Sequence, residues 1–175
     1  LDALGLREET AVAFTSDHGD TCGSRGLYDK DAFMFEELVR VPLLLRLPGG
    51  PCGQVRTELV SNMDLAPTAL DLAGAAPSRP PDGRSLATLL ARGTGDWPDD
   101  LMAEFSGLRF PASLRLLRWG RAKYIFNPLG GDELYDLEAD PWELHNRMAD
   151  TASDSTMNRI LDECRRRLRR RLEAS

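Results

Sequence analysis

The sequence predicts an α/β fold followed by a small antiparallel sheet and a C-terminal helix. Residues 11–15 form a β-branched and aromatic run that breaks into Ser16-Asp-His-Gly-Asp20, a pattern typical of a buried strand leading into a glycine-containing loop. Short strand candidates recur between residues 101 and 137. Residues 155–175 carry apolar side chains at helical spacing. Together these patterns place an alternating α/β part first and an antiparallel part second.

The N-terminal half is expected to alternate helices and strands. Its patterns predict, in order, the last turns of an amphipathic helix over residues 1–6, the strand over 11–15, a short helix or irregular segment over 31–39, an interior strand over 41–47, a short strand over 57–60 and a helix over 65–73. Asn62 or Asp64 is expected to cap the last helix, and Gly74 to stop it.

The C-terminal half reads as antiparallel. A Gly/Pro/Asp-rich stretch over residues 91–100 suggests a boundary, so we predict two domains, over residues 1–95 and 96–175. A hairpin is expected at Trp119-Gly-Arg121 and a turn at 127–131. The expected strands cover residues 101–105, 113–119, 121–126 and 133–137.

The terminal helix is amphipathic and basic. Residues 155–175 contain seven arginines and three acidic residues and therefore have a net charge of +4. Because the whole chain has a net charge of −6, residues 1–154 have a net charge of −10. A basic helix docked on an acidic body needs no nucleic acid, so we predict neither a nucleic-acid nor a membrane partner. Its apolar positions are Met157, Leu161, Cys164, Leu168 and Leu172.

The composition is that of a globular protein: 42% of the residues are hydrophobic and 29% charged, and the mean hydropathy is −0.35. Three widely spaced cysteines without a CxxC pair argue against a disulfide framework and a zinc knuckle. The chain starts inside an element, without an initiator methionine or signal core, so we expect it to be the C-terminal part of a longer protein.

The loop after the first strand carries the candidate metal ligands. Asp17 offers a hard oxygen and His18 a neutral nitrogen, and Asp20 can add a carboxylate behind them. Two adjacent ligands cannot fill a coordination sphere, and in isolation the better interpretation is that Asp17 caps a turn and His18 is an ordinary loop residue. Lys30 in isolation reads as a solvated lysine.

Four segments favour functional roles for Asp17, His18 and Lys30. Together, and in their order along the chain, they resemble the sulfatase family of the alkaline-phosphatase-like superfamily. They are Phe14-Thr-Ser-Asp-His-Gly-Asp20 with Gly26-Leu-Tyr-Asp-Lys30, Glu36-Glu-Leu-Val-Arg-Val-Pro-Leu43, Asn62-Met-Asp-Leu-Ala-Pro-Thr-Ala-Leu70 with Asp82-Gly-Arg-Ser-Leu86, and Glu133-Leu-Tyr-Asp-Leu-Glu-Ala-Asp-Pro-Trp-Glu143. The implied fold is the C-terminal part of an alkaline-phosphatase-like α/β sandwich plus the small antiparallel subdomain.

The resemblance implies sulfate ester hydrolysis by the full-length protein. Asp17 and His18 match the family's second pair of metal ligands, and Lys30 matches the lysine that holds a sulfate oxygen. The implied metal is calcium, with manganese, iron or zinc as alternatives because of the histidine nitrogen. The implied substrate is a small-molecule or saccharide sulfate ester. The formylglycine nucleophile is expected in the preceding part, so the 175 residues alone should show no turnover.

Two departures from the family pattern matter. Arg25 stands where many members have a histidine, which leaves the surroundings of the metal pair open and suits either a more anionic substrate or an inactive member. Ala75-Ala-Pro-Ser-Arg79 looks like the nucleophile motif, but an alanine cannot become formylglycine, so we treat it as coincidence. A phosphonate or phosphate monoesterase of the same superfamily and a noncatalytic pseudoenzyme are the alternative functions.

Overall fold

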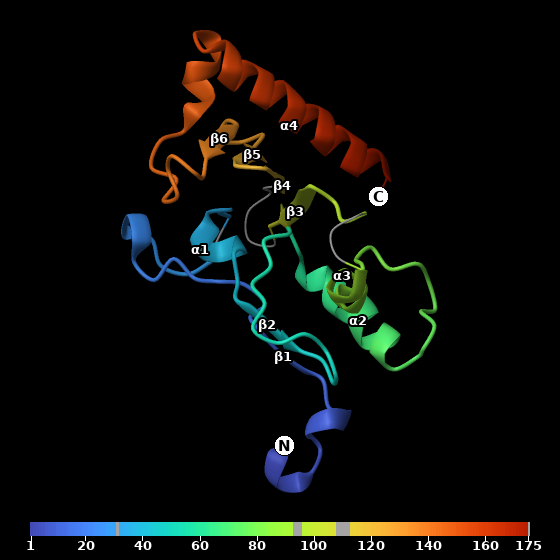
Figure 1. Ribbon diagram of the computed structural model, residues 1–175. Coiled ribbons are helices and arrows are strands. Elements are labelled where there is room, and N and C mark those ends of the chain that lie inside the picture. Colours follow the sequence, from blue (N-terminus) through green and yellow to red (C-terminus); the bar gives the residue numbers. More distant parts are fainter. Residues whose placement is uncertain (31, 93–95, 108–112, 175) are drawn as a thin grey trace. The chain divides into compact units, whose positions relative to one another are not determined.

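The computed structural model describes the chain except for residues 31, 93–95, 108–112 and 175 (Figure 1). The chain divides into two compact units. The first unit comprises residues 1–17 and 41–98, and the second comprises residues 18–40 and 99–175. The domains expected from the sequence, 1–95 and 96–175, stay a prediction. The units are groups of residues in contact, and they place the loop after the first strand with the antiparallel sheet.

The first unit contains a two-stranded ribbon. Strand β1 (Val12–Thr15) pairs antiparallel with β2 (Leu43–Arg46), as the sequence predicted two strands here. The expected burial of these strands is wrong for this chain. Phe14 and Leu44 lie opposite each other and are 59% and 66% exposed. A ribbon of two strands cannot bury both of its own faces, so an apolar pattern alone does not place it in a core.

The helices of the first unit differ partly from expectation. The helix expected over residues 1–6 is wrong: only a 3₁₀ turn forms, η1 (Asp2–Leu4), because Gly5 takes a left-handed φ of 66°. The 3₁₀ turn η2 (Arg7–Glu9) follows. The strand expected over residues 57–60 is not formed. The helix expected over residues 65–73 is confirmed as α2 (Leu65–Leu72), and the 3₁₀ turn η4 (Asn62–Asp64) precedes it. The sequence patterns missed helix α3 (Leu86–Arg92).

Asp64 ties the start of α2 to the segment before α3. Asp64 is the N-cap residue of α2, one of the two expected caps, but its side chain makes no capping bond to that helix. The turn η4 before it is capped by Ser61, whose hydroxyl accepts from Met63 N and whose own N–H donates to Asp64 Oδ2 at 2.8 Å. The other oxygen, Oδ1, accepts from Arg84 N at 2.8 Å. The side chain of Asp64 is therefore buried but satisfied, and it links two of the segments that carry the family resemblance.

The second unit is built on a four-stranded antiparallel sheet in the order β3-β4-β5-β6, as expected. Gly120 turns the β4–β5 hairpin with a φ of 52°, and Trp119 pairs with Ala122. After the 3₁₀ helix η5 (Arg147–Ala152), helix α4 (Ser155–Ala174) confirms the predicted terminal helix. The strands are β3 (Asp100–Ser106), β4 (Ser113–Trp119), β5 (Ala122–Phe126) and β6 (Glu133–Asp136).

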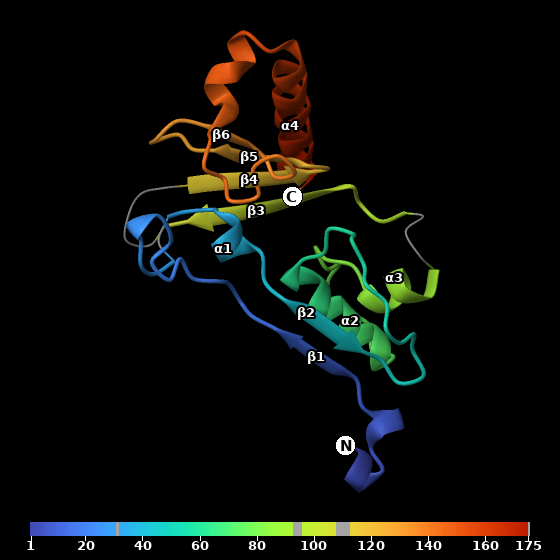
Figure 2. The same ribbon diagram turned by 60° about the vertical axis from the view of Figure 1, so that its left-hand side comes forward.

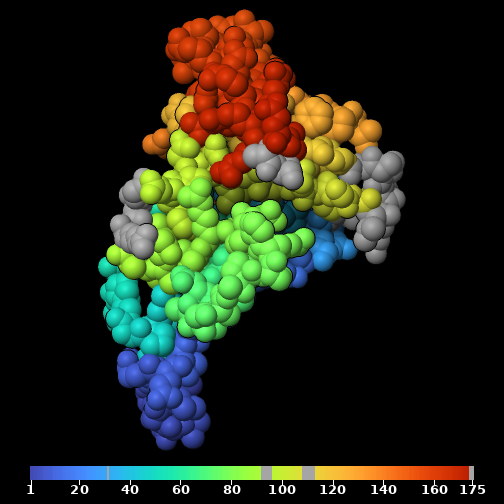
Figure 3. All heavy atoms as spheres, turned by 90° about the vertical axis from the view of Figure 1, so that its right-hand side faces the viewer, coloured from blue at the N-terminus to red at the C-terminus, as the bar shows by residue number. Residues whose placement is uncertain are grey.

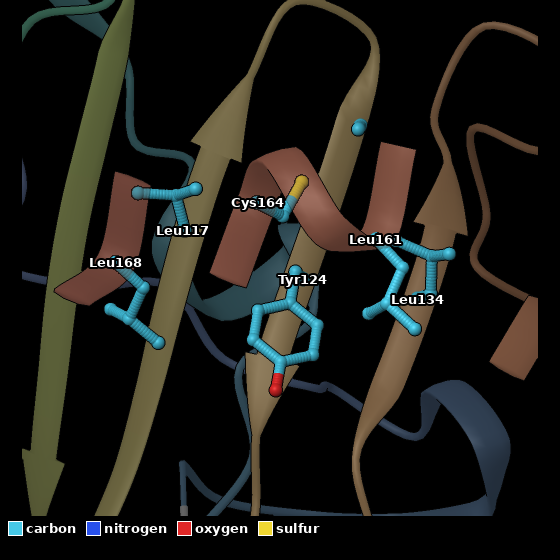
Figure 4. Packing of buried hydrophobic residues seen from close by; sticks show 7 residues of the cluster. Leu117, Tyr124, Leu134, Leu161, Cys164 and Leu168 are labelled. Atoms are coloured by element: carbon cyan, nitrogen blue, oxygen red, sulfur yellow. The ribbon is translucent and has the colours of Figure 1, made fainter. Parts of the chain in front are cut away.

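Both faces of this sheet are covered (Figure 2). On one face, helix α4 packs against the strands, and Figure 4 shows its apolar side chains meeting those of the sheet. On the other face, Met34 and Phe35 pack with strand residues. Alternation along the strands supplies both layers. The first layer contains Leu117, Tyr124, Leu134, Leu161, Cys164 and Leu168, and the second contains Met34, Leu114, Leu116, Ile125 and Tyr135.

The arginines of α4 pair with acidic residues of the second unit, as the charge balance predicted. Arg167 contacts Asp99 at 2.6 Å and Asp100 at 2.9 Å, and Arg171 donates to Asp100. Figure 3 shows α4 in red beside the preceding orange segment, which contains η5. Among the described residues, no helix has the length and apolar character needed to cross a membrane.

Candidate functional site

The loop over residues 18–30 presents the candidate residues of the second unit. It contains the 3₁₀ turn η3 (Ser24–Gly26) and is followed by helix α1 (Glu36–Val39). Three non-glycine residues of this loop have left-handed φ angles: Cys22 at 46°, Arg25 at 55° and Asp29 at 76°. Such conformations are uncommon for residues with a Cβ and persist where surrounding contacts enforce them. The loop is thus held in a tightly specified shape.

His18 and Lys30 are brought together across this loop. Lys30 Nζ lies 2.6 Å from His18 Nε2. The other ring nitrogen, Nδ1, lies 2.7 Å from the carbonyl oxygen of Gly19, which can only accept, so Nδ1 carries the proton. With Nδ1 as the donor, Nε2 can accept a hydrogen bond from the Lys30 side chain. The sequence placed these residues twelve positions apart; the fold makes them neighbours.

Gly19 fixes the start of the loop against α1. Its N–H donates to the carbonyl oxygen of Leu38 at 2.8 Å. A Cβ at this position would lie 1.8 Å from the carbonyl oxygen of Glu37, so only glycine fits. The close approach of two backbones therefore sets where the adjacent His18 lies.

Gly19→Ala is expected to lower the free energy of unfolding by about 3 kcal/mol, because one of the two backbones must move. Gly26→Ala in the same loop is the matched control: its φ is 70°, but nothing lies within 4 Å of its Cβ position. That change should cost only about 1 kcal/mol of backbone strain. Urea unfolding of both variants makes the comparison, and equal losses would contradict the steric account.

Asp17 closes the first unit, where Asn62 holds its backbone. The Asn62 side-chain amide donates to the carbonyl oxygens of Ser16 at 2.9 Å and Asp17 at 3.2 Å. Thr15 Oγ1 donates to Asn62 Oδ1 at 3.4 Å. The sequence marked Asn62 only as a helix cap within a family segment. In the structure Asn62 holds the backbone directly after β1, at Ser16 and Asp17.

Asp20 and Cys22 form a small turn next to the candidate ligands. The backbone N–H of Cys22 donates to Asp20 Oδ1 at 2.7 Å, and this bond lowers the pKa of the Asp20 carboxyl. The Asp20 carboxylate in turn raises the pKa of the Cys22 thiol, which disfavours the reactive thiolate. Within the described part of the chain, no three His, Cys, Asp or Glu side chains converge as a metal-binding group.

A buried charge cluster that the sequence patterns did not reveal lies behind α1. Lys123 on β5 is fully buried and contacts Glu143 Oε1 at 2.7 Å and Glu36 Oε1 at 3.1 Å. The other Glu143 oxygen accepts from Glu36 N at 2.6 Å. A buried lysine on a strand gives no local signal, because the alternating pattern predicts only an inward-facing position.

A surface cavity of about 280 Å³ lies beside α4, away from the loop residues. Arg115, Arg165 and Arg169 are among its lining residues. Arg115 pairs with Glu104 at 2.9 Å and Arg165 with Asp132 at 3.0 Å, so much of the positive charge is neutralised within the unit. These ion pairs give Arg115 and Arg165 a structural role within the second unit. The absence of a nucleic-acid partner stays a prediction.

Comparison with known proteins relates most of this chain to sulfatases. The family described as N-sulphoglucosamine sulphohydrolase, C-terminal, matches residues 23–172, a range that includes Lys30 but starts after His18. Choline-sulfatase of Rhizobium meliloti is 40% identical over 149 residues, which cover 83% of this chain and 28% of that protein. Arylsulfatase K of Mus musculus is 36% identical over 156 residues, with 83% and 28% covered.

Solved structures agree. A structure of BT4656 in complex with D-glucosamine-2-N,6-O-disulfate superposes with a TM-score of 0.86 at 27% identity and covers 99% of this chain and 36% of that one. Phosphonate monoester hydrolase of Agrobacterium radiobacter has a TM-score of 0.77 at 29% identity, with 95% and 37% covered. The chain spans about 28% of the length of both named relatives. It belongs to the sulfatase family, of alkaline-phosphatase-like fold, and corresponds to that family's C-terminal segment.

Proposed function

We propose that the whole protein hydrolyses sulfate esters, with Asp17 and His18 as ligands of a divalent metal and Lys30 as the residue that binds a sulfate oxygen. The observation that carries this proposal is the pairing of His18 Nε2 with Lys30 Nζ at 2.6 Å in a chain of the sulfatase family. The nucleophile, a formylglycine by family resemblance, would lie outside these residues. The 175 residues alone are therefore expected to be inactive.

The donor atoms suit a metal ion. His18 donates its Nδ1 proton to a backbone carbonyl, an arrangement that orients ligating histidines and leaves Nε2 to bind. Asp17 adds a carboxylate from a strand end held by Asn62. When bound, a divalent cation would polarise a sulfuryl oxygen as a Lewis acid. We propose calcium because of the family resemblance, with manganese, iron or zinc as alternatives because an imidazole nitrogen suits them.

Lys30 is proposed to stabilise negative charge on the substrate. Its compact ammonium carries three N–H donors, which suit a tetrahedral oxyanion. The Nε2 lone pair of His18 can serve only one partner at a time. Once that lone pair is engaged elsewhere, the ammonium can donate to a sulfate oxygen at the same place, where a fixed donor stabilises charge that develops during the reaction.

The proposed substrate is a small-molecule or saccharide sulfate ester. The structure of BT4656 holds a disulfated glucosamine, and a relative from Bacteroides thetaiotaomicron at 33% identity is an N-acetylglucosamine-6-O-sulfatase. Neither nucleic acid nor membrane is part of this proposal.

A phosphonate or phosphate monoesterase is the second candidate, favoured by the likeness to phosphonate monoester hydrolase. The full-length protein should be assayed with 4-nitrophenyl sulfate, 4-nitrophenyl phosphate and a 4-nitrophenyl phosphonate monoester. The proposal expects the sulfate ester to have the highest kcat/KM. Preference for either phosphorus ester would support the second candidate. A metal-loaded protein without turnover on any of the three would indicate a pseudoenzyme.

Asp17→Ala in the full-length protein is expected to abolish metal binding. The wild type, purified without added metal, should contain about one divalent ion per chain by elemental analysis, because ligand oxygens in a folded site bind the ion selectively. Asp2→Ala is the matched control, since Asp2 is an exposed carboxylate of the same unit and pairs with Arg7 at 3.2 Å. Unchanged metal content in Asp17→Ala would remove Asp17 from the site.

A further inference from the structure

We propose that Arg25 is a positioning residue of the sulfate site: it holds the loop over residues 18–30, and with it Lys30, against the C-terminal sheet. The inference rests on the proposed function for its catalytic readout. In this arrangement the guanidinium takes no part in binding the substrate. Its substitution for the family's common histidine then signals neither a more anionic substrate nor an inactive protein.

The guanidinium of Arg25 makes hydrogen bonds and a ring contact with several residues. Its Nη1 donates to Glu37 Oε1 at 2.8 Å. Its Nη2 donates to the carbonyl oxygens of Trp142 and, at 3.3 Å, Glu143. Its Cζ lies 3.8 Å from the centroid of the Phe35 ring. One planar group thus joins a loop residue, α1 and a turn more than a hundred residues later, a combination that a planar fork with five donors can make.

Glu143, one of the residues that Arg25 contacts, is itself held by the C-terminal sheet. Glu143 has a left-handed φ of 53°; its carboxylate forms an ion pair with Lys123 at 2.7 Å and accepts a hydrogen bond from Glu36 N at 2.6 Å. Lys123 belongs to β5, in the middle of the sheet, and is fully buried. The contacts therefore run from the sheet through Lys123 and Glu143 to Arg25. Arg25 and Glu143 both have left-handed φ angles, which residues with a Cβ keep where surrounding contacts enforce them.

Hydrogen bonds within the loop connect the segment around Arg25 to Lys30. Gly23 N donates to the carbonyl oxygen of Leu27 at 2.8 Å, which closes the turn around Arg25. The buried Thr21 hydroxyl donates to the carbonyl oxygen of Asp29 at 2.9 Å, directly before Lys30. The loop is thus closed on itself and is attached to α1 and the residue before it through Gly19, Ser24 and Arg25. Of these three residues, Arg25 also attaches the loop to the carbonyl oxygens of Trp142 and Glu143, so its replacement removes the attachment that lies nearest to Lys30 in the sequence.

The positive charge of Arg25 balances the carboxylate of Glu37, which lies 2.8 Å away. Partial burial raises the pKa of Glu37, but its hydrogen bonds, including those from Ser24 and Arg25, outweigh this and hold the pKa below its ordinary value. Glu37 is therefore an anion at neutral pH and requires a cation. An arginine stays protonated there, whereas an imidazole loses its charge near pH 6.5 and then has one N–H donor.

The test uses the full-length protein with Arg25→Lys, Arg25→His and the control Arg121→Lys, which changes another paired arginine of the same unit. We expect Arg25→Lys to lower kcat by about tenfold or more with KM within about threefold, because a displaced donor loses transition-state binding. Arg25→His should lose a further tenfold, roughly, between pH 6 and pH 8 relative to the wild type. Arg121→Lys should match the wild type.

Hydrogen exchange of the amides over residues 18–30 gives the second readout, independent of turnover. Both Arg25 variants should exchange faster there, and Arg25→His should do so more at pH 8 than at pH 6 after correction for intrinsic rates. Unchanged exchange with kcat within twofold of the wild type would overturn the proposal, as would a loss confined to KM, which would place Arg25 on the substrate. A wild type without sulfatase turnover would refute the proposed function, while exchange would still decide whether Arg25 holds the loop.

Discussion

Replacing Lys30 by alanine in the full-length protein is expected to lower sulfate ester turnover by about a hundredfold or more, with metal content nearly unchanged. Loss of one preorganised donor to a developing oxyanion has an effect of this size. Lys30 Nζ lies 2.6 Å from Nε2 of His18, the proposed metal ligand, and under the proposed function it donates to a sulfate oxygen there. Lys30 is not one of the proposed metal ligands, so the metal should remain.

Lys30→Arg and Arg166→Ala complete this experiment. A planar guanidinium cannot reproduce a point charge at the same reach, so arginine should restore little turnover. Arg166 is an exposed cation on α4 that pairs with Glu163, and its removal should leave turnover at the wild-type level. Near-normal turnover in Lys30→Ala, or loss of the metal together with the activity, would show that Lys30 does not bind the sulfate.

Leu168→Asp is expected to destabilise the second unit by about 3–5 kcal/mol. Leu168 is 6% exposed and packs with Leu117 and Tyr124 of the sheet, so the change removes apolar contacts and buries a carboxylate. Urea unfolding followed by circular dichroism measures the loss. Leu168→Ala, which adds no charge, should still cost about 2–4 kcal/mol, because the neighbouring side chains cannot fill the space completely.

Arg166→Ala and Arg170→Ala are the matched changes on the solvent side of α4. Their side chains are 68% and 66% exposed, so each should alter the free energy of unfolding by no more than about 0.5 kcal/mol. Similar losses at all three positions would mean that the face of α4 that packs on the sheet is assigned wrongly.

The antiparallel sheet and α4 could be predicted almost to the residue because their signals are local. Alternation between residues 100 and 136 and the glycine at position 120 specify strands and a hairpin, and the apolar spacing after residue 155 specifies a helix. The ribbon of β1 and β2 was predicted as strands but wrongly as buried. A run of apolar residues indicates that a strand is suited to burial. Whether the strand is exposed depends on which other elements pack against it.

The candidate site shows the same division. The order of its motifs pointed to Asp17, His18 and Lys30, and their roles stay predictions. Proximity of His18 to Lys30 depends on how the intervening loop closes, which the glycines permit but do not specify. Arg25 was read as part of the site's surroundings, yet its partners are Glu37 and a turn 117 residues further on.

The sequence by itself determined the family, the positions of the helix and strands of the C-terminal half, and the residues proposed for sulfate chemistry. Only the tertiary structure decided that Lys123 is fully buried between Glu36 and Glu143, and that Arg25 stacks on Phe35. Periodicity reports which face of an element is apolar, because that preference acts between neighbours along one element. Ion pairs between distant segments depend on the distance and burial that the whole fold creates, and no local pattern contains those quantities.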